Sequence, residues 1–239
     1  MSCKSTTLEY QAGDTTCIGE YFTPKDATGP LPVVVVVHAW DGLNEEVRDK
    51  CHRLAHEGYI AFAADIHGNG KTYSDPSELE AALGPFFQDR AMLLERTRGA
   101  VDAAKTIPGA DATRIGAMGY CFGGTAVLDV ARAGGLGVSG VVSFHGGLEG
   151  NTLDKPAATD CKVLVLHGQD DPMVPPDKVA AFMAEMDAQK ADWQLHAYSG
   201  TMHAFTRPAA NNPDFGTVYN AAAYRRSWQA MCNFFDEIL

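Results

Sequence analysis

Five consecutive valines, at positions 33–37, restrict the fold of this chain more than any other feature. A β-branched run without polar alternation predicts a strand that is buried on both faces, as in a parallel sheet covered by helices. Strand and helix patterns then alternate along the chain, which implies βαβ crossovers. We therefore predict an α/β protein with a mostly parallel sheet and helices on both faces, and we expect residues 1–239 to form a single domain.

The other predicted elements follow from periodicity and from turn residues. A β-hairpin is predicted at residues 6–22, around the turn Gly13-Asp14. Further strands are expected at residues 59–64, 114–118, 138–144, 161–166 and 193–198. Helices are expected at residues 43–56, 77–107, 122–133, 176–189 and 221–238, with a break in the second near Gly84-Pro85. Residues 65–76 and 208–219 are irregular and are predicted to form loops over a site.

Composition and charge exclude several function classes. Hydrophobic residues make up 46% of the chain, which suits a large core, but no apolar run approaches the roughly 18–20 residues that span a bilayer. The net charge of −11 disfavours nucleic acid and anionic membranes as partners. The first residues show no apolar secretory signal, and none of the 6 cysteines forms a CxxC pair. We expect a cytoplasmic protein with reduced thiols.

One motif indicates nucleophilic chemistry. Residues 119–123 read Gly-Tyr-Cys-Phe-Gly and stand between a predicted strand and a predicted helix. Gly-x-nucleophile-x-Gly in that context is a nucleophile elbow, whose tight turn leaves no room for bulk at Gly119 or Gly123. Cys121 would then project at the carboxyl edge of the sheet, where a helix N-terminus favours a thiolate and an oxyanion. In the alternative interpretation Cys121 is a small core residue in an ordinary βα turn.

A cysteine nucleophile needs a base, and the base needs an orienting acid. In α/β-hydrolases these follow the nucleophile in the order acid, histidine. Asp170 and Asp171 follow the strand at 161–166, and either could be the acid. His203 follows the strand at 193–198, whereas His196 falls within that strand. We therefore predict a triad with His203 as base.

The three motifs at residues 119–124, 168–175 and 200–205 resemble those of the dienelactone hydrolase family of α/β-hydrolases. The resemblance runs from the valine strand to the C-terminus and implies the α/β-hydrolase fold. It implies a Cys121-His203-Asp171 triad, because the family's acid precedes Val-Pro by two intervening residues. It also implies that the N–H groups of Phe122 and Trp40 form the oxyanion hole, in agreement with what acyl transfer requires.

The resemblance also implies that Arg207, four residues after the histidine, binds a substrate carboxylate; a solvated loop charge is the alternative. The chain departs from the founding lactone hydrolases at Ala39, where they carry a glutamate that holds the resting thiol. We hypothesise that Cys121 pairs directly with the histidine at rest, and the competing idea is that Asp41 replaces the glutamate. A second family arginine has no clear match, and Arg90 is a weak candidate.

The predicted activity is a cofactor-independent hydrolysis of a small ester or lactone through a thioester intermediate. Two alternatives stay open: a thioesterase or general carboxylesterase with the same triad, and a non-catalytic protein that binds or senses through a reactive thiol. His52 and His56 lie four residues apart but lack the glutamate of a zinc protease motif, so we expect no metal site. We expect no cofactor, and the expected partner is the small-molecule substrate. The sequence does not predict an oligomeric state.

Overall fold

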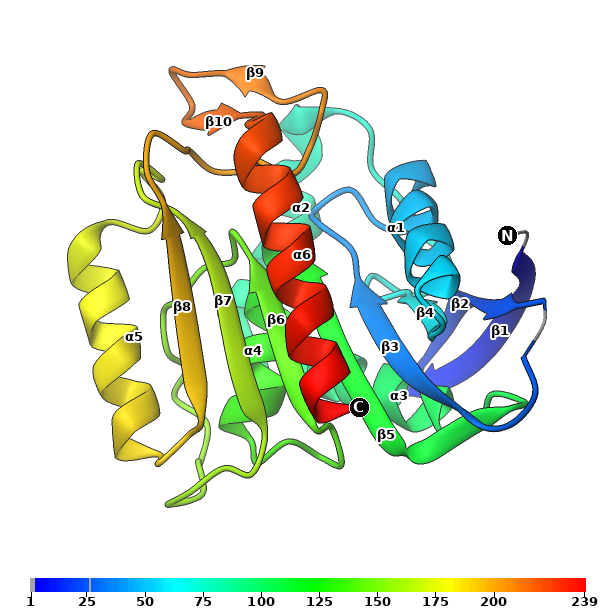
Figure 1. The fold of residues 1–239 in the computed structure, drawn as a ribbon. Helices are drawn as coiled ribbons and strands as arrows, with labels where there is room; N and C mark the ends of the chain where they lie inside the picture. Colours follow the sequence, from blue (N-terminus) through cyan, green and yellow to red (C-terminus); the bar gives the residue numbers. More distant parts are fainter. Residues whose placement is uncertain (1–2, 26) are drawn as a thin grey trace.

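The computed structural model describes residues 3–25 and 27–239 and is built around an eight-stranded sheet (Figure 1). The strand order is β1-β2-β4-β3-β5-β6-β7-β8. The strands are β1 (Cys3–Ala12), β2 (Thr15–Pro24), β3 (Leu31–Val37), β4 (Ile60–Ala64), β5 (Ala110–Tyr120), β6 (Gly140–Phe144), β7 (Lys162–Gly168) and β8 (Trp193–Tyr198). β1 pairs antiparallel with β2, and β2 pairs antiparallel with β4, while all pairs from β4 to β8 are parallel. The prediction of a mostly parallel sheet is confirmed.

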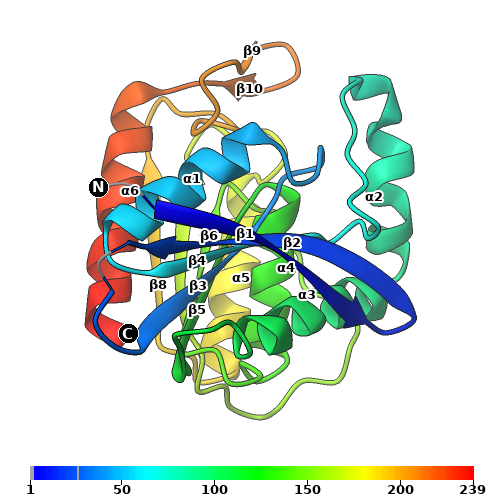
Figure 2. The same cartoon turned by 90° about the vertical axis from the view of Figure 1, so that its right-hand side faces the viewer.

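Helices cover both faces of the sheet (Figure 2). α1 (Glu45–His56) and α6 (Ala221–Ile238) pack on one face, and α3 (Arg90–Ala104), α4 (Phe122–Arg132) and α5 (Pro176–Ala188) pack on the other. The valine run at positions 33–37 shows why the sheet needs a layer of helices on each face. Val33, Val35 and Val37 belong to the core beneath α3, α4 and α5, whereas Val34 and Val36 belong to the core beneath α1 and α6. All five side chains are completely buried, as the sequence pattern predicted.

The helical segment predicted at residues 77–107 is broken, but at another position. A short 3-10 helix (Pro76–Glu78) leads into α2 (Leu79–Gln88), which contains Pro85, and the break before α3 falls at Asp89. Asp89 has an extended backbone, with φ −125° and ψ 90°, and its side chain accepts hydrogen bonds from the N–H groups of Ala91 and Met92. The prediction of a break at Gly84-Pro85 is wrong because the N-cap of α3 determines where the chain turns.

The segment predicted to be irregular at residues 208–219 contains a short hairpin. β9 (Asn211–Asn212) pairs antiparallel with β10 (Thr217–Val218), and the hairpin lies beyond the carboxyl ends of the parallel strands (Figure 1). Gly216 has φ +83°, and a Cβ atom at this position would lie 2.2 Å from Cγ of Pro172. The hairpin is therefore packed directly against the loop that follows β7.

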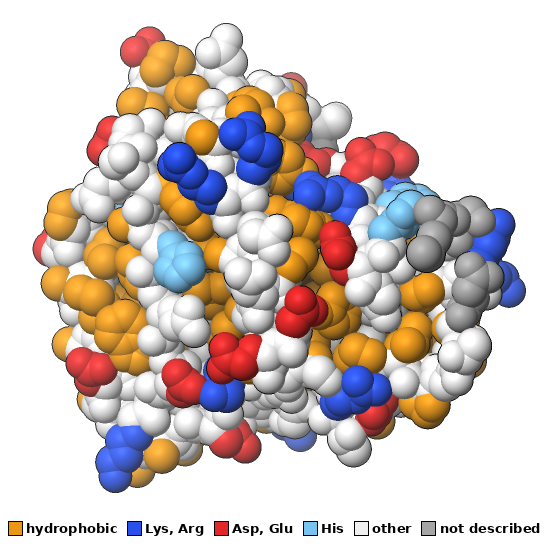
Figure 3. All heavy atoms as spheres, in the orientation of Figure 1, with side chains coloured by type: hydrophobic (Ala, Val, Ile, Leu, Met, Phe, Trp, Pro, Cys, Tyr) orange, Lys and Arg blue, Asp and Glu red, His pale blue; other side chains and the backbone are white. Residues whose placement is uncertain are grey.

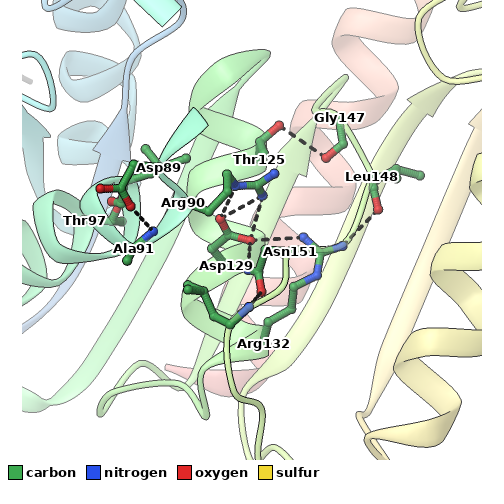
Figure 4. Close-up of polar contacts among 12 residues, drawn as sticks. Asp89, Arg90, Ala91, Thr97, Thr125, Asp129, Arg132, Gly147, Leu148 and Asn151 are labelled. Carbon is green, nitrogen blue, oxygen red and sulfur yellow. Dashed lines mark hydrogen bonds and ion pairs between the residues drawn. The ribbon is translucent and has the colours of Figure 1, made fainter. Parts of the chain in front are cut away.

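A buried network of charges joins α3, α4 and α5, and Figure 4 shows its part around Arg90, Asp129 and Arg132. Asp129 of α4 is completely buried and accepts two hydrogen bonds of 2.8 Å from Arg90 at the start of α3. Arg132, also buried, lies 3.3 Å from Asp129 and 2.9 Å from Glu185 of α5. The Asn151 amide donates to Asp129 at 2.7 Å. Each buried charge thus has an opposite charge beside it, as burial of ions requires.

No helix within residues 3–25 and 27–239 is long and apolar enough to cross a membrane. On the face drawn in Figure 3, acidic and basic side chains are spread among apolar ones. The negative net charge of the chain is therefore not gathered into one patch on this face.

Candidate active site

Cys121 occupies a strained turn between β5 and α4. Its backbone has φ +53° and ψ −113°, a region that residues other than glycine rarely adopt. The two flanking glycines are required by close contacts, because a Cβ atom at Gly119 would lie 2.1 Å from the carbonyl oxygen of Gly123. A Cβ atom at Gly123 would lie 2.3 Å from the carbonyl oxygen of Val37. The turn places the partly exposed Cys121 at the N-terminus of α4.

His203 and Asp171 form a buried hydrogen-bonded pair. Asp171 follows β7 and His203 follows β8, and His203 Nδ1 donates to Asp171 Oδ2 at 2.7 Å. The other carboxylate oxygen of Asp171 accepts the N–H of Met173 at 2.9 Å. Asp170, in contrast, is exposed. Nδ1 is thus committed to the carboxylate, and Nε2 is left as the atom that can act on another group.

The surroundings of His203 favour its protonated form. Nε2 is buried and has no hydrogen bond of standard geometry to any residue in the described part of the chain. Burial lowers the pKa of His203, but the charge of the nearby Cys121 and the hydrogen bond to Asp171 raise the pKa more, to about 10. The structure therefore favours a protonated His203 ring when the neighbouring Cys121 carries a negative charge.

The hairpin β9–β10 fixes the backbone of His203. The N–H of His203 donates to the carbonyl oxygen of Gly216 at 2.9 Å, and the N–H of Val218 donates to the carbonyl oxygen of His203 at 3.1 Å. Sequence reasoning missed this support, because the pairing joins short segments that have no strand pattern of their own.

Sequence reasoning also missed His145, which packs against His203. Its ring centroid lies 5.0 Å from that of His203, and its Nε2 hydrogen-bonds Thr206 Oγ1 at 2.8 Å. Burial and the charge of His203 both lower the pKa of His145 well below its ordinary value, so this ring is neutral. His145 directly follows β6, and its place at the carboxyl end of a parallel strand was the signal that could have identified it.

Two backbone N–H groups named by the sequence analysis have no hydrogen-bond acceptor in the described part of the chain. Phe122 is the first residue of α4, so its N–H has no acceptor within the helix. The N–H of Trp40, in the loop after β3, has no acceptor among residues 3–25 and 27–239. His67 Nε2 donates to the carbonyl oxygen of Trp40 at 2.9 Å and thereby orients the peptide. These two amides are the groups that the sequence predicted for an oxyanion hole.

His38 anchors the start of the Trp40 loop. Its Nδ1 donates to the carbonyl oxygen of Ala39 at 2.6 Å, and its Nε2 accepts the N–H of Ile66 at 3.1 Å. Burial, with a contribution from the neighbouring His67, lowers the pKa of His38 to about 3. The neutral ring therefore acts as a fixed connection between the loops after β3 and β4.

The other candidate residues lie in different surroundings. Arg207 forms an ion pair with Asp41, with 2.9 Å between Nη1 and Oδ2. Arg90 is partly buried and belongs to the network around Asp129. His196 is exposed on β8.

All six cysteines are free thiols. In the part of the chain that the structure describes, no three His, Cys, Asp or Glu side chains are grouped so that they could hold a metal ion. The groups that the structure brings to this site are the Cys121 thiol group, the hydrogen-bonded His203–Asp171 pair and backbone amides.

Comparisons with known proteins show which family this chain resembles. Residues 18–239 match the model of the dienelactone hydrolase family. A Yersinia pestis protein named "Putative carboxymethylenebutenolidase" is 30% identical to this chain, and the match covers 98% of this chain and 88% of the Yersinia protein. The Escherichia coli K12 protein of the same name is 31% identical, over 90% of this chain and 80% of its own. The crystal structure of a dienelactone hydrolase-like promiscuous phosphotriesterase from metagenomic libraries superposes on this structure with a TM-score of 0.94. The two sequences are 36% identical, and the match covers 100% of this chain and 99% of the other.

Proposed function

Because the chain belongs to the dienelactone hydrolase family of α/β-hydrolases, we propose that it cleaves a small ester or lactone with a Cys121-His203-Asp171 triad. The family makes the chain an ester or lactone hydrolase, which disfavours a non-catalytic thiol protein. One observation carries the proposed triad. The Asp171–His203 pair leaves a buried Nε2 without a standard partner beside the strained Cys121.

In the first half of the reaction, the Cys121 thiolate attacks the substrate carbonyl carbon and forms a C–S bond. The carbonyl oxygen becomes an oxyanion and accepts hydrogen bonds from the N–H groups of Trp40 and Phe122. When the tetrahedral intermediate collapses, the bond to the leaving oxygen breaks and that oxygen takes the Nε2 proton of His203. The products are a thioester on Cys121 and a free alcohol; for a lactone, the alcohol stays attached to the acyl group.

In the second half, His203 is neutral and acts as a base. Its Nε2 removes a proton from a water molecule as the water oxygen attacks the thioester carbonyl. The same two N–H groups bind the second oxyanion. Collapse breaks the C–S bond, releases the carboxylic acid and restores the thiolate and the imidazolium, which Asp171 stabilises through Nδ1.

A second candidate activity uses the same groups. The metagenomic relative described as a promiscuous phosphotriesterase is 36% identical to this chain along nearly its whole length. A thiolate can attack a phosphotriester as well as a carbonyl, so uncharged phosphotriesters are candidate secondary substrates. Thioesters and simple carboxylic esters stay within the same acyl-transfer chemistry.

Substitution of the proposed nucleophile tests the function. Cys121→Ala should lower kcat/KM for p-nitrophenyl butyrate by about 10⁴–10⁶-fold, because the acceptor of the acyl group is removed. Cys3→Ala, which changes a partly exposed cysteine on β1, should leave kcat/KM unchanged. A purified, folded Cys121→Ala protein that retains wild-type turnover would show that another group carries out the attack.

A further inference from the structure

Arg207 lies beside the proposed active site, and its guanidinium is already bound by carboxylates of this chain. Its Nη1 is 2.9 Å from Asp41 Oδ2, and its Nε is 3.6 Å from Glu46 Oε2. Arg207 stands four residues after His203 in the same loop, and Asp41 directly follows Trp40. The ion pair therefore joins the loop of the proposed base to the loop of the proposed oxyanion donor.

Asp41 is held in position by groups other than Arg207. Its side chain is 7% exposed, and Asn44 Nδ2 donates to the same carboxylate oxygen at 2.8 Å. The N–H of Tyr73 donates to the backbone carbonyl oxygen of Asp41 at 3.0 Å. A carboxylate that is buried and hydrogen-bonded in this way is a fixed partner of the arginine.

The charges around Arg207 balance within the protein. Glu46 is also 3.5 Å from Lys50 Nζ, so two carboxylates share two cations. The four side chains Asp41, Glu46, Lys50 and Arg207 have a net charge of zero. A substrate carboxylate that approached Arg207 would meet a positive charge already balanced by Asp41 and Glu46, and the negative charges of these two side chains would oppose its binding.

The wall beside Cys121 is aromatic and uncharged. The ring of Phe122 lies 5.3 Å from that of Phe86 and 6.1 Å from that of Phe87, both on α2. His67 stacks on Phe122 at 5.9 Å, and burial lowers the pKa of His67, so this ring is neutral. Phe87 is 49% exposed, which leaves apolar surface uncovered next to the residue that follows Cys121.

From these contacts we propose that the ester cleaved by this chain has an uncharged, apolar acyl group, and that Asp41 determines this preference by occupying Arg207. An apolar acyl chain gains contact with the exposed part of Phe87. An anionic acyl group meets an arginine that is already bound. The proposal names the substrate class of the function proposed above and rests on it.

Two esters that differ in one terminal group test this specificity. p-Nitrophenyl hexanoate and mono-p-nitrophenyl adipate have acyl chains of equal length, but the second ends in a carboxylate. The wild type should have a kcat/KM about 10–100-fold higher for the hexanoate ester, the range expected when a charged group lacks a hydrogen-bonding partner. Asp41→Asn keeps the shape of the loop and should reduce this preference about 10-fold, because Arg207 becomes available to the adipate carboxylate.

Glu9→Gln, at an exposed position on β1, changes the net charge of the protein by the same amount as Asp41→Asn. This control should leave the preference for the hexanoate ester unchanged. A wild type that cleaves the adipate ester as fast as the hexanoate ester would overturn the proposal. So would an Asp41→Asn enzyme that cleaves the hexanoate ester with the wild-type preference. If Asp41→Asn does not fold, Glu46→Gln should reduce the preference in the same direction. A wild type that cleaves neither ester would refute the proposed function itself, and the specificity with it.

Discussion

Asp170 and Asp171 are neighbours in the sequence, but only one is placed to act on His203. Asp171 is buried, and its two carboxylate oxygens accept hydrogen bonds from His203 Nδ1 and from the N–H of Met173. Asp170 is exposed. The two aspartates therefore form a matched comparison: they have the same side chain and adjacent positions, but only Asp171 accepts a hydrogen bond from His203.

Asp171→Asn should lower kcat by roughly 10³–10⁴-fold, because the imidazole loses the acceptor that fixes its tautomer and stabilises its positive charge. Asp170→Asn should change kcat little. Steady-state kinetics with p-nitrophenyl butyrate measure both variants. Swapped results would assign the acid to Asp170 instead.

At the scale of elements, periodicity and turn residues predicted only local features, whereas the pairing of Asp171 with His203 was expected from the resemblance to a family. The valine run and the Gly119–Gly123 elbow each lie within one short segment, so periodicity and turn chemistry identified them. The partners of Arg207 lie in segments that are distant in sequence, and no pattern indicates them. For His145, its place directly after β6 was a usable signal, but its contact with His203 could not be read from the sequence. The break at Asp89 was misplaced because capping competes with proline as a helix boundary.

The hairpin β9–β10 should affect catalysis through the position of His203. Gly216→Ala would bring a Cβ atom against Pro172, displace the carbonyl that accepts the His203 N–H, and lower kcat by about 10–100-fold. Gly200→Ala is the matched control, since Gly200 also has a positive φ, +62°, but a Cβ atom there meets nothing within 4 Å. Comparison of kcat for the two variants separates the effect of the contact with Pro172 from the effect of backbone strain at a positive φ. Equal losses in both would contradict a positioning role for the hairpin.

At the scale of the whole molecule, a network of buried charges connects the helices on one face of the sheet, and Figure 4 shows its part around Asp129. Asp129 balances Arg90 and Arg132, and all three lie largely out of solvent. Removal of one member leaves the others as uncompensated buried charges, which is far more costly than loss of an exposed pair.

Asp129→Asn should therefore lower the free energy of unfolding by about 3–5 kcal/mol, measured by urea denaturation. Asp102→Asn removes the carboxylate of an exposed pair with Lys105, 2.9 Å away, and should cost less than about 1 kcal/mol. Similar losses in the two variants would show that the network contributes no more than a surface ion pair.

Direct detection of the acyl-enzyme is the sharpest test of the central claim that Cys121 carries the acyl group. The wild type, mixed with p-nitrophenyl butyrate and quenched in acid within the first turnover, should gain the mass of one butyryl group. Peptide mapping should place that group on Cys121, and hydroxylamine should remove it, as expected for a thioester. A butyryl group mapped to any other residue, or turnover that proceeds without an acylated enzyme under these conditions, would contradict the account.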